Sequence, residues 1–128
     1  MKDVLIELHT LRESVDTLVL PAAYEYAGRL AAAAAQAKAA GISVIPQVEA
    51  ANRIGRLIEN LEKARAALGK VIDKAEGMHD ELEKQAELLT HDGVDAAAAA
   101  RSGADALELA IDDELWPLPK YREMLFPV

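Results

Sequence analysis

The sequence has no cysteine among its 128 residues. This absence excludes disulfide bonds, thiolate zinc sites and cysteine nucleophiles, and it fits the reducing cytoplasm, where we expect the protein to be located. Aromatic residues make up only 4% of the chain, whereas 26 residues are alanine. Alanine has the highest helix propensity and lets helix backbones approach closely. The composition therefore predicts close-packed helices and a fold of the all-α class.

The chain is also poor in positive charge and in long apolar runs. Lys and Arg number 14 against 22 Asp and Glu, which gives a net charge of −8. A surface this acidic repels phosphate groups, so we expect neither nucleic acid nor an anionic membrane as a partner. No stretch approaches the roughly 20 apolar residues that a membrane-spanning helix needs, and the N-terminus lacks the basic start and apolar run of a signal peptide.

The length gives room for one domain, so we expect residues 1–128 to form a single helical domain. Apolar residues recur at steps of three and four from Val4 to Leu30, which predicts a first helix over about residues 3–40. Pro21 lies inside this helix. Because proline lacks an N–H and crowds the preceding turn, we expect a kink or a break there, with two helices in tandem as the alternative.

A second helix is predicted over about residues 46–89. Gly41 fits a left-handed C-cap of the first helix, and Pro46 fits the first turn of the second. A seven-residue repeat then continues over five heptads. Its first position is Ile54, Leu61, Leu68, Ala75, Leu82 and Leu89, and the position three residues later is Leu57, Ala64, Val71 and Met78.

A third helix is predicted over about residues 94–115. The segment from Thr90 to Gly93 interrupts the heptads, and Asp92 fits the N-cap of the helix that follows. The far end of this helix is strongly acidic. It is either a solvated face or a docking surface for a basic neighbour, and its residues are Asp105, Glu108, Asp112, Asp113 and Glu114.

Short connections between long helices predict an antiparallel three-helix bundle with up-down-up topology. The expected core contains Leu11, Val15, Leu18, Leu57, Leu61, Leu68, Val71, Leu82, Leu107 and Ile111. The second helix is longer than the third can cover, so an apolar stripe around residues 46–61, opposite the alanines at 31–35, stays exposed. Exposed stripes mark interfaces, so we expect self-association.

The chain shows little that could carry catalysis. Glu76 and His79 have the Glu-x-x-His spacing of di-iron helical bundles, but the further carboxylates and the second such pair are missing, so surface residues are the alternative interpretation. The seven glycines form no phosphate-binding loop, and no serine lies in a nucleophile-elbow sequence. We therefore expect no catalytic, cofactor-binding or metal-binding residue in this chain.

Two segments carry a family pattern. The C-terminal segment has the spacing W-P-x-P-x-Y-x-x-[ML]-L-F, formed by Trp116, Pro117, Pro119, Tyr121, Leu125 and Phe126. It resembles the C-terminal end of type III glutamine synthetases. Near the N-terminus, Ile6-Glu7 and Leu20-Pro21-Ala22-Ala23, followed by Tyr24 or Tyr26, resemble the run with which that family leaves its catalytic barrel.

The resemblance implies a C-terminal helical domain without the catalytic barrel. In that family the upstream domains bind ATP, glutamate, ammonia and Mg²⁺ or Mn²⁺, and no motif for these ligands occurs here, so no catalytic residue carries over. The implied role is structural: supporting the barrel and contributing to a large homo-oligomer. The alternative is an independent helical scaffold or adaptor that offers its acidic face to another protein.

The proline-rich tail, residues 116–128, is apolar enough for us to expect that it is ordered. Counting residues away from the two expected turns places Trp116 beside residue 66 of the second helix and residue 20 of the first. That position lies next to Pro21, with Tyr24 and Leu68 within reach. The alternative is a flexible tail that orders only against the missing barrel.

Overall fold

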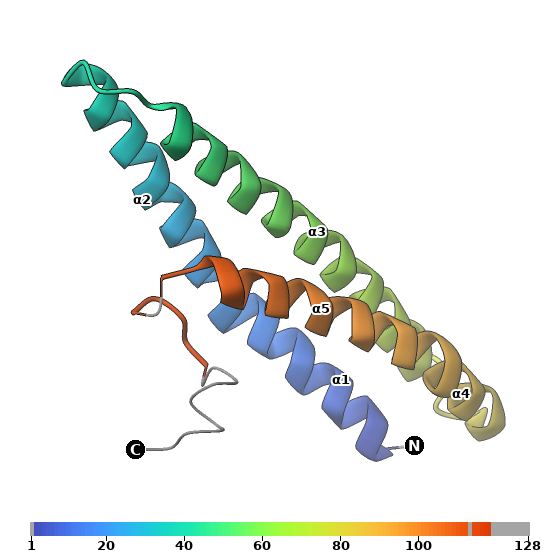
Figure 1. Ribbon diagram of the computed structural model, residues 1–128. Helices are drawn as coiled ribbons and strands as arrows, with labels where there is room; N and C mark the ends of the chain where they lie inside the picture. The colour runs from blue at the N-terminus through green and yellow to red at the C-terminus, as the bar shows by residue number, and fades with distance from the viewer. Residues whose placement is uncertain (1, 113, 119–128) are drawn as a thin grey trace.

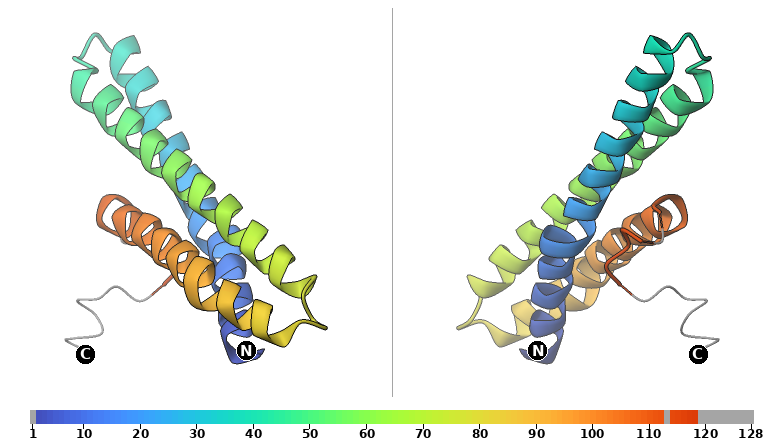
Figure 2. Two further views of the ribbon diagram at one scale, coloured as in Figure 1. Left: turned by 90° about the vertical axis from the view of Figure 1, so that its right-hand side faces the viewer. Right: turned by 90° about the vertical axis from the view of Figure 1, so that its left-hand side faces the viewer.

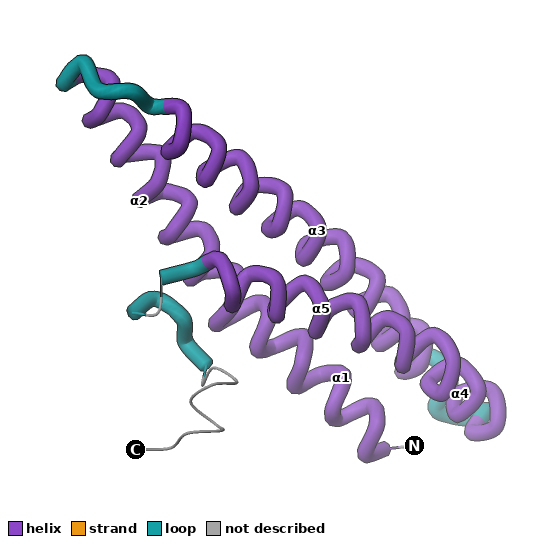
Figure 3. Tube along the Cα trace, in the orientation of Figure 1, coloured by secondary structure: helices purple, strands orange, loops and turns teal. Residues whose placement is uncertain are grey.

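The computed structural model describes residues 2–112 and 114–118, and all of its regular structure is helical (Figure 3). The predicted all-α class is therefore confirmed. In chain order the elements are α1 (Lys2–Ser14), the π-helical turn η1 (Val15–Val19), α2 (Leu20–Ala39), α3 (Ile45–Glu76), α4 (Leu82–Leu88), the π-helical turn η2 (Leu89–Gly93) and α5 (Val94–Ala110).

The described elements form three helical rods (Figure 1). The first rod consists of α1, η1 and α2 and leads to the turn at Gly41. The second rod is α3, which returns along the first, and the third consists of α4, η2 and α5, which runs back along α3. Because α3 contacts both other rods, its two flanks carry most of the packing.

The turn between α2 and α3 has the predicted capping residues. Gly41 has a φ of +76°, a left-handed conformation that glycine adopts without strain. Its N–H donates to the carbonyl of Lys38 (3.1 Å), and the N–H of Ile42 donates to that of Ala37 (2.9 Å). These two bonds are a Schellman motif. Pro46 lies in the first turn of α3, so both capping predictions are confirmed.

The chain does not break at Pro21. Instead, the N–H of Leu20 donates to the carbonyl of Val15, five residues back, within the wider turn η1. This turn relieves the crowding that a proline ring causes in the preceding helical turn. It also rotates the following residues, so Val19 is buried (1% exposed) and Leu18 is 40% exposed. The prediction of Leu18 as a core residue is therefore wrong.

The second rod ends earlier than predicted. α3 stops at Glu76, and residues 77–81 form the turn that was expected at 90–93. The buried amide of Gln85 donates to the carbonyl of Ala75 (2.8 Å), which also accepts the N–H of Met78 (3.0 Å), and so it joins α4 to the end of α3. Residues 89–93 are instead π-helical and join α4 to α5, so Asp92 caps no helix. Leu82 follows the new turn and is exposed, contrary to its predicted place in the core.

The third rod also ends before the predicted Leu115. Ile111 is extended (φ −85°, ψ 145°), and Asp112 then forms a turn by accepting the N–H of Glu114 on its side chain (3.0 Å). The backbone carbonyl of Asp112 accepts the N–H of Trp116 (3.2 Å). Asp112, which the sequence analysis assigns to the acidic end of the third helix, therefore also forms a turn.

The core divides into two clusters. One lies at the level of η1 and the end of α5 and contains Val15, Val19, Leu20, Ala23, Ile54, Ile58, Leu61, Leu107, Ile111 and Trp116. The other lies near the N-terminus and contains Leu8, Leu68, Ile72, Ala75, Leu89, Ala96, Ala97 and Ala100. Five predicted core residues are buried, namely Val15, Leu61, Leu68, Leu107 and Ile111, while Leu11, Leu57 and Val71 are partly buried.

Beyond the end of α5, α2 and α3 continue as a two-helix arm (Figure 2). We define this arm as residues 24–53. None of its residues is buried, because two helices alone cannot enclose a core. The large apolar side chains of Ile42, Ile45 and Val48 are exposed at its tip (62%, 66% and 42%).

Two rods approach closely where Gly103 of α5 meets Leu61 of α3. A Cβ at Gly103 would lie 3.3 Å from the Cα of Leu61 and 3.1 Å from its Cδ1. Backbone atoms cannot move aside as a flexible side chain can, so a methyl group here must push the helices apart. Glycine at this position therefore sets the spacing between α3 and α5.

We expect Gly103→Ala to destabilise the fold by about 1–2 kcal/mol, because overpacking outweighs the better helix propensity of alanine. Gly55 in α3 is the matched control, since a Cβ there meets nothing within 4 Å. Gly55→Ala should stabilise the fold by about 0.5–1 kcal/mol. Urea unfolding followed by circular dichroism measures both. Equal stabilisation by the two substitutions would contradict the close approach.

Candidate functional site

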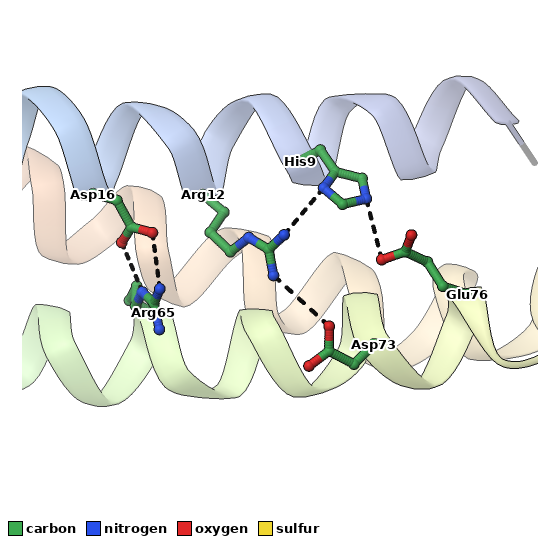
Figure 4. Close-up of polar contacts among 6 residues, drawn as sticks. All are labelled: His9, Arg12, Asp16, Arg65, Asp73 and Glu76. Atoms are coloured by element: carbon green, nitrogen blue, oxygen red, sulfur yellow. Dashed lines mark hydrogen bonds and ion pairs between the residues drawn. The ribbon is translucent and has the colours of Figure 1, made fainter.

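A row of polar side chains joins the first rod to α3, and it is the most organised polar feature of the described residues (Figure 4). At its centre, Arg65 of α3 binds Asp16 of η1 with two bonds, Nε to Oδ1 (2.6 Å) and Nη2 to Oδ2 (2.8 Å). A bidentate pair fixes orientation as well as distance. It therefore fixes the register between the first rod and α3.

Nearer the N-terminus, His9 and Arg12 extend the row (Figure 4). Arg12 Nη2 lies 3.2 Å from His9 Nδ1, and Arg12 Nη1 lies 3.9 Å from the Oδ1 of Asp73. His9 Nε2 lies 3.4 Å from the Oε1 of Glu76. A guanidinium only donates, so Nδ1 accepts from it, and this assigns the proton to Nε2, which faces the carboxylate.

On the other side of Asp16, Tyr24 of α2 donates a hydrogen bond from its hydroxyl to the carboxylate of Glu62 in α3. This bond raises the pKa of Tyr24, because the carboxylate favours the protonated hydroxyl. The Arg65 guanidinium in turn lowers the pKa of Asp16, chiefly through its hydrogen bonds, and the pKa of Arg65 is raised by the same bonds. All three effects stabilise contacts between the first rod and α3.

This polar row has the chemistry of a helix clamp. Its members are paired with one another across two helices, and none is a serine or threonine nucleophile beside a base. Sequence reasoning missed the row, since single charges beside an apolar stripe carry no signal until the register between two helices is known. Glu76 and Tyr24 are the exceptions, because the sequence singles out each of them, but with a different partner.

Glu76 and His79 do not act together. The carboxylate of Glu76 faces His9, whereas His79 Nδ1 lies 3.3 Å from the backbone carbonyl of Glu76 and Nε2 lies 3.3 Å from Asp80. Across the described residues, no three His, Asp or Glu side chains gather as a metal site requires. Nor does that part of the chain contain a helix long and apolar enough to cross a membrane.

The family-pattern residues lie in three places. Pro21 is exposed in the first turn of α2, Trp116 is buried (8% exposed), and Pro117 is exposed. The remaining four lie outside the described residues: Pro119, Tyr121, Leu125 and Phe126. Of the predicted ordered tail, Leu118 is also described and packs against the core cluster that contains Trp116, whereas residues 119–128 lie outside the described part.

Trp116 shares a core cluster with Leu20 and Ala23, the two residues that flank Pro21 and Ala22. Its predicted level on the first rod is therefore close to the observed one. The predicted level on α3 is wrong, because Trp116 clusters with Leu61 and Leu68 belongs to the other cluster. The third rod starts at residue 82 and not at 94, which shifts its register against α3. In the described chain, Trp116 Nε1 is buried without a hydrogen-bond partner.

Removing the central ion pair should cost stability in a pH-dependent way. We expect Asp16→Asn to destabilise the fold by about 0.5–1 kcal/mol at pH 7, a magnitude that allows for the partial exposure of both side chains. Because the folded-state pKa of Asp16 is lowered, its contribution is present above the ordinary value of 3.8 and is lost as the pH falls through the folded-state pKa. Urea unfolding at pH 7 and pH 3 measures this change, with Glu13→Gln as the exposed control. A difference from wild type that is as large at pH 3 as at pH 7 would contradict the pair.

The chain has one tryptophan, so its fluorescence reports on Trp116 alone. We expect a blue-shifted emission maximum and protection from iodide, because the indole is buried in the core. Urea should shift the emission to the red in the same transition that circular dichroism reports. A red maximum with complete quenching in the folded protein would show that the indole is exposed.

The comparison with known proteins gives one short likeness. A glutamine synthetase of Bacteroides fragilis (strain YCH46) is 69% identical to this chain over 26 residues, which are 20% of this chain and 4% of that protein. No protein-family model and no solved structure matches the chain. A short stretch of the chain is thus similar to a glutamine synthetase, and the chain spans only a small part of the length of that relative.

Proposed function

We propose that this chain is a C-terminal helical structural and oligomerisation domain of the kind found in type III glutamine synthetases. The observation that carries the proposal is the 69% identity over 26 residues to a glutamine synthetase. The W-P-x-P-x-Y pattern of the tail and the run around Pro21 support the type III assignment. An up-down-up bundle and an ordered proline-rich tail belong to the same proposal.

In this proposal the chain is not an enzyme by itself and binds neither ATP nor Mg²⁺ or Mn²⁺. Its partners are further copies of itself and, in a full-length parent, the catalytic barrel, whereas nucleic acid and membranes are not partners. Its location is the cytoplasm. The parent activity, ATP-dependent ligation of ammonia to glutamate, requires metals and phosphate-binding groups that the family holds in the barrel.

A second proposal, a free-standing scaffold, is favoured by one feature. The third rod concentrates acidic side chains, with Glu83, Glu87, Asp92, Asp95, Asp105 and Glu108 against Lys84 and Arg101, and Asp112 follows its end. Such a surface suits a basic protein partner. The gene can distinguish the two proposals, because a barrel sequence in frame before the codon for Met1 would establish the first and exclude the second.

The purified chain should form no glutamine from ATP, glutamate, ammonia and magnesium, and its mass in solution should exceed 13.8 kDa. A coupled phosphate-release assay measures the first quantity, and light scattering on a size-exclusion column measures the second. Product from a pure sample would contradict the non-catalytic role, and a monomer at high concentration would contradict the oligomerisation role.

A further inference from the structure

The apolar side of α3 is wider than its two neighbours cover. The first heptad position is fully buried, with Ile54, Leu61, Leu68 and Ala75 all at 0% exposure. The second position is only partly buried, and its residues are Leu57, Ala64, Val71 and Met78. Repeated apolar residues at a seven-residue spacing are the signature of a helix–helix seam. This second stripe is therefore a seam that the described chain leaves half covered.

Hollows in the surface follow this stripe along α3. One lies along the first turns of α3 and is lined by Pro46, Glu49, Ala50, Asn52, Arg53 and Arg56. The next lies between α3 and α5 and is lined by Leu57, Asn60, Ala64, Ala99, Ser102 and Ala106. A third lies at the far end of the stripe and is lined by Met78, Lys84, Glu87, Leu88, His91 and Asp92. We call the surface formed by this stripe and the three hollows the α3 trough. Its α5 wall has only small side chains, so another helix backbone can approach closely.

The hollow at the arm end has Arg53 and Arg56 against Glu49, and the hollow at the other end has Glu87 and Asp92 against Lys84, so the two ends of the α3 trough carry opposite net charge. Arg53 and Arg56 are exposed at the arm end, and Asp92 and Asp95 are exposed on the third rod near the other end. Gly103 lies against Leu61, and α5 runs antiparallel to α3, so Asp95 lies about two helical turns further along, near the level of Leu68. Arg53 lies about the same distance from Leu61 in the opposite direction.

The positive and negative groups lie at about equal distances on either side of the middle of α3. In an antiparallel pair of α3 helices, the positive end of each copy therefore faces the negative end of the other. We infer that two copies of this chain dock through the α3 trough about a two-fold axis near Asn60, with their α3 helices antiparallel. This inference rests on the oligomerisation role proposed above and names its surface. Arg53 and Arg56 of each copy then face Asp92 and Asp95 of the other, and the half-buried stripe is covered over the whole of α3. A two-fold contact uses the same surface on both copies, so the dimer is closed.

Charge reversal tests the pairing. The wild type is expected to sediment as a dimer, whereas Arg53→Glu/Arg56→Glu and, separately, Asp92→Arg/Asp95→Arg should give monomers with unchanged helix content. The variant with all four substitutions should again be a dimer, because the opposite charges face each other with reversed sign. Arg29→Glu/Lys38→Glu is the control, since these exposed residues of α2 line none of the three hollows and the same charge is reversed. It should stay dimeric.

The outcomes of these experiments distinguish failure of the α3 trough from failure of the oligomerisation role. A monomeric wild type would contradict both the oligomerisation role and the α3 trough. A wild-type dimer that persists in both double charge reversals, or one that the control disrupts equally, would contradict the trough alone. Failure of the four-residue variant to dimerise, with its helix content intact, would contradict the paired arrangement of the charges.

Cross-linking tests the axis, and the absence of native cysteine makes the test clean. Asn60→Cys places one thiol beside the proposed two-fold axis, so mild oxidation should join two chains through a disulfide. Glu59→Cys is the matched control, because its neighbouring position on α3 turns away from the trough. A non-reducing gel should show a covalent dimer for Asn60→Cys only. Equal cross-linking of both variants, or none in Asn60→Cys, would contradict the proposed axis.

Discussion

The packing of α5 against α3 at Gly103 is the contact on which the rest of the fold depends. The absent side chain lets the two helices approach until a Cβ would meet the Cα of Leu61 at 3.3 Å. This distance brings small α5 residues such as Ala100 into the core, where larger side chains would not fit. The high alanine content therefore serves packing. A helix face of small side chains can lie close to a neighbouring helix and bury that helix's leucines and isoleucines. The same alanines give the α5 side of the α3 trough its small side chains.

Two π-helical turns adjust the helices to this packing. Each adds one residue to a helical turn and so rotates everything that follows against the core. In η1 the rotation moves the apolar stripe from Leu18 to Val19 just before Pro21. In η2 it lets Leu89 and Gly93 both face inward, with Gly93 against Leu8. The helices remain continuous, so positions that sequence rules assign to a kink or a break serve to change register.

The sequence predicts the helical class, the Gly41 turn and the buried heptad position of α3, because each depends on local propensity or on a short-range repeat. It does not locate the turn at residues 77–81. Leu82 and Leu89 keep the seven-residue spacing across that turn, so the pattern alone reads as one helix. This single error moves the third rod by several residues, and it misplaces Trp116 on α3 and the expected cap at Asp92. The Asp16–Arg65 pair could not be predicted from the sequence either, because it depends on the register between the first rod and α3.

The two segments that carry the family pattern lie at opposite ends of the sequence, yet the core brings them together. Leu20 and Ala23 from the first segment and Trp116 from the second share one buried cluster. The turn at Asp112 makes this possible, because it ends α5 and directs the indole back toward η1 and α2. A pattern whose members meet in a core is one that packing alone can maintain. For Leu20, Ala23 and Trp116, the described members of the two segments, packing in this cluster is a sufficient physical reason for their presence.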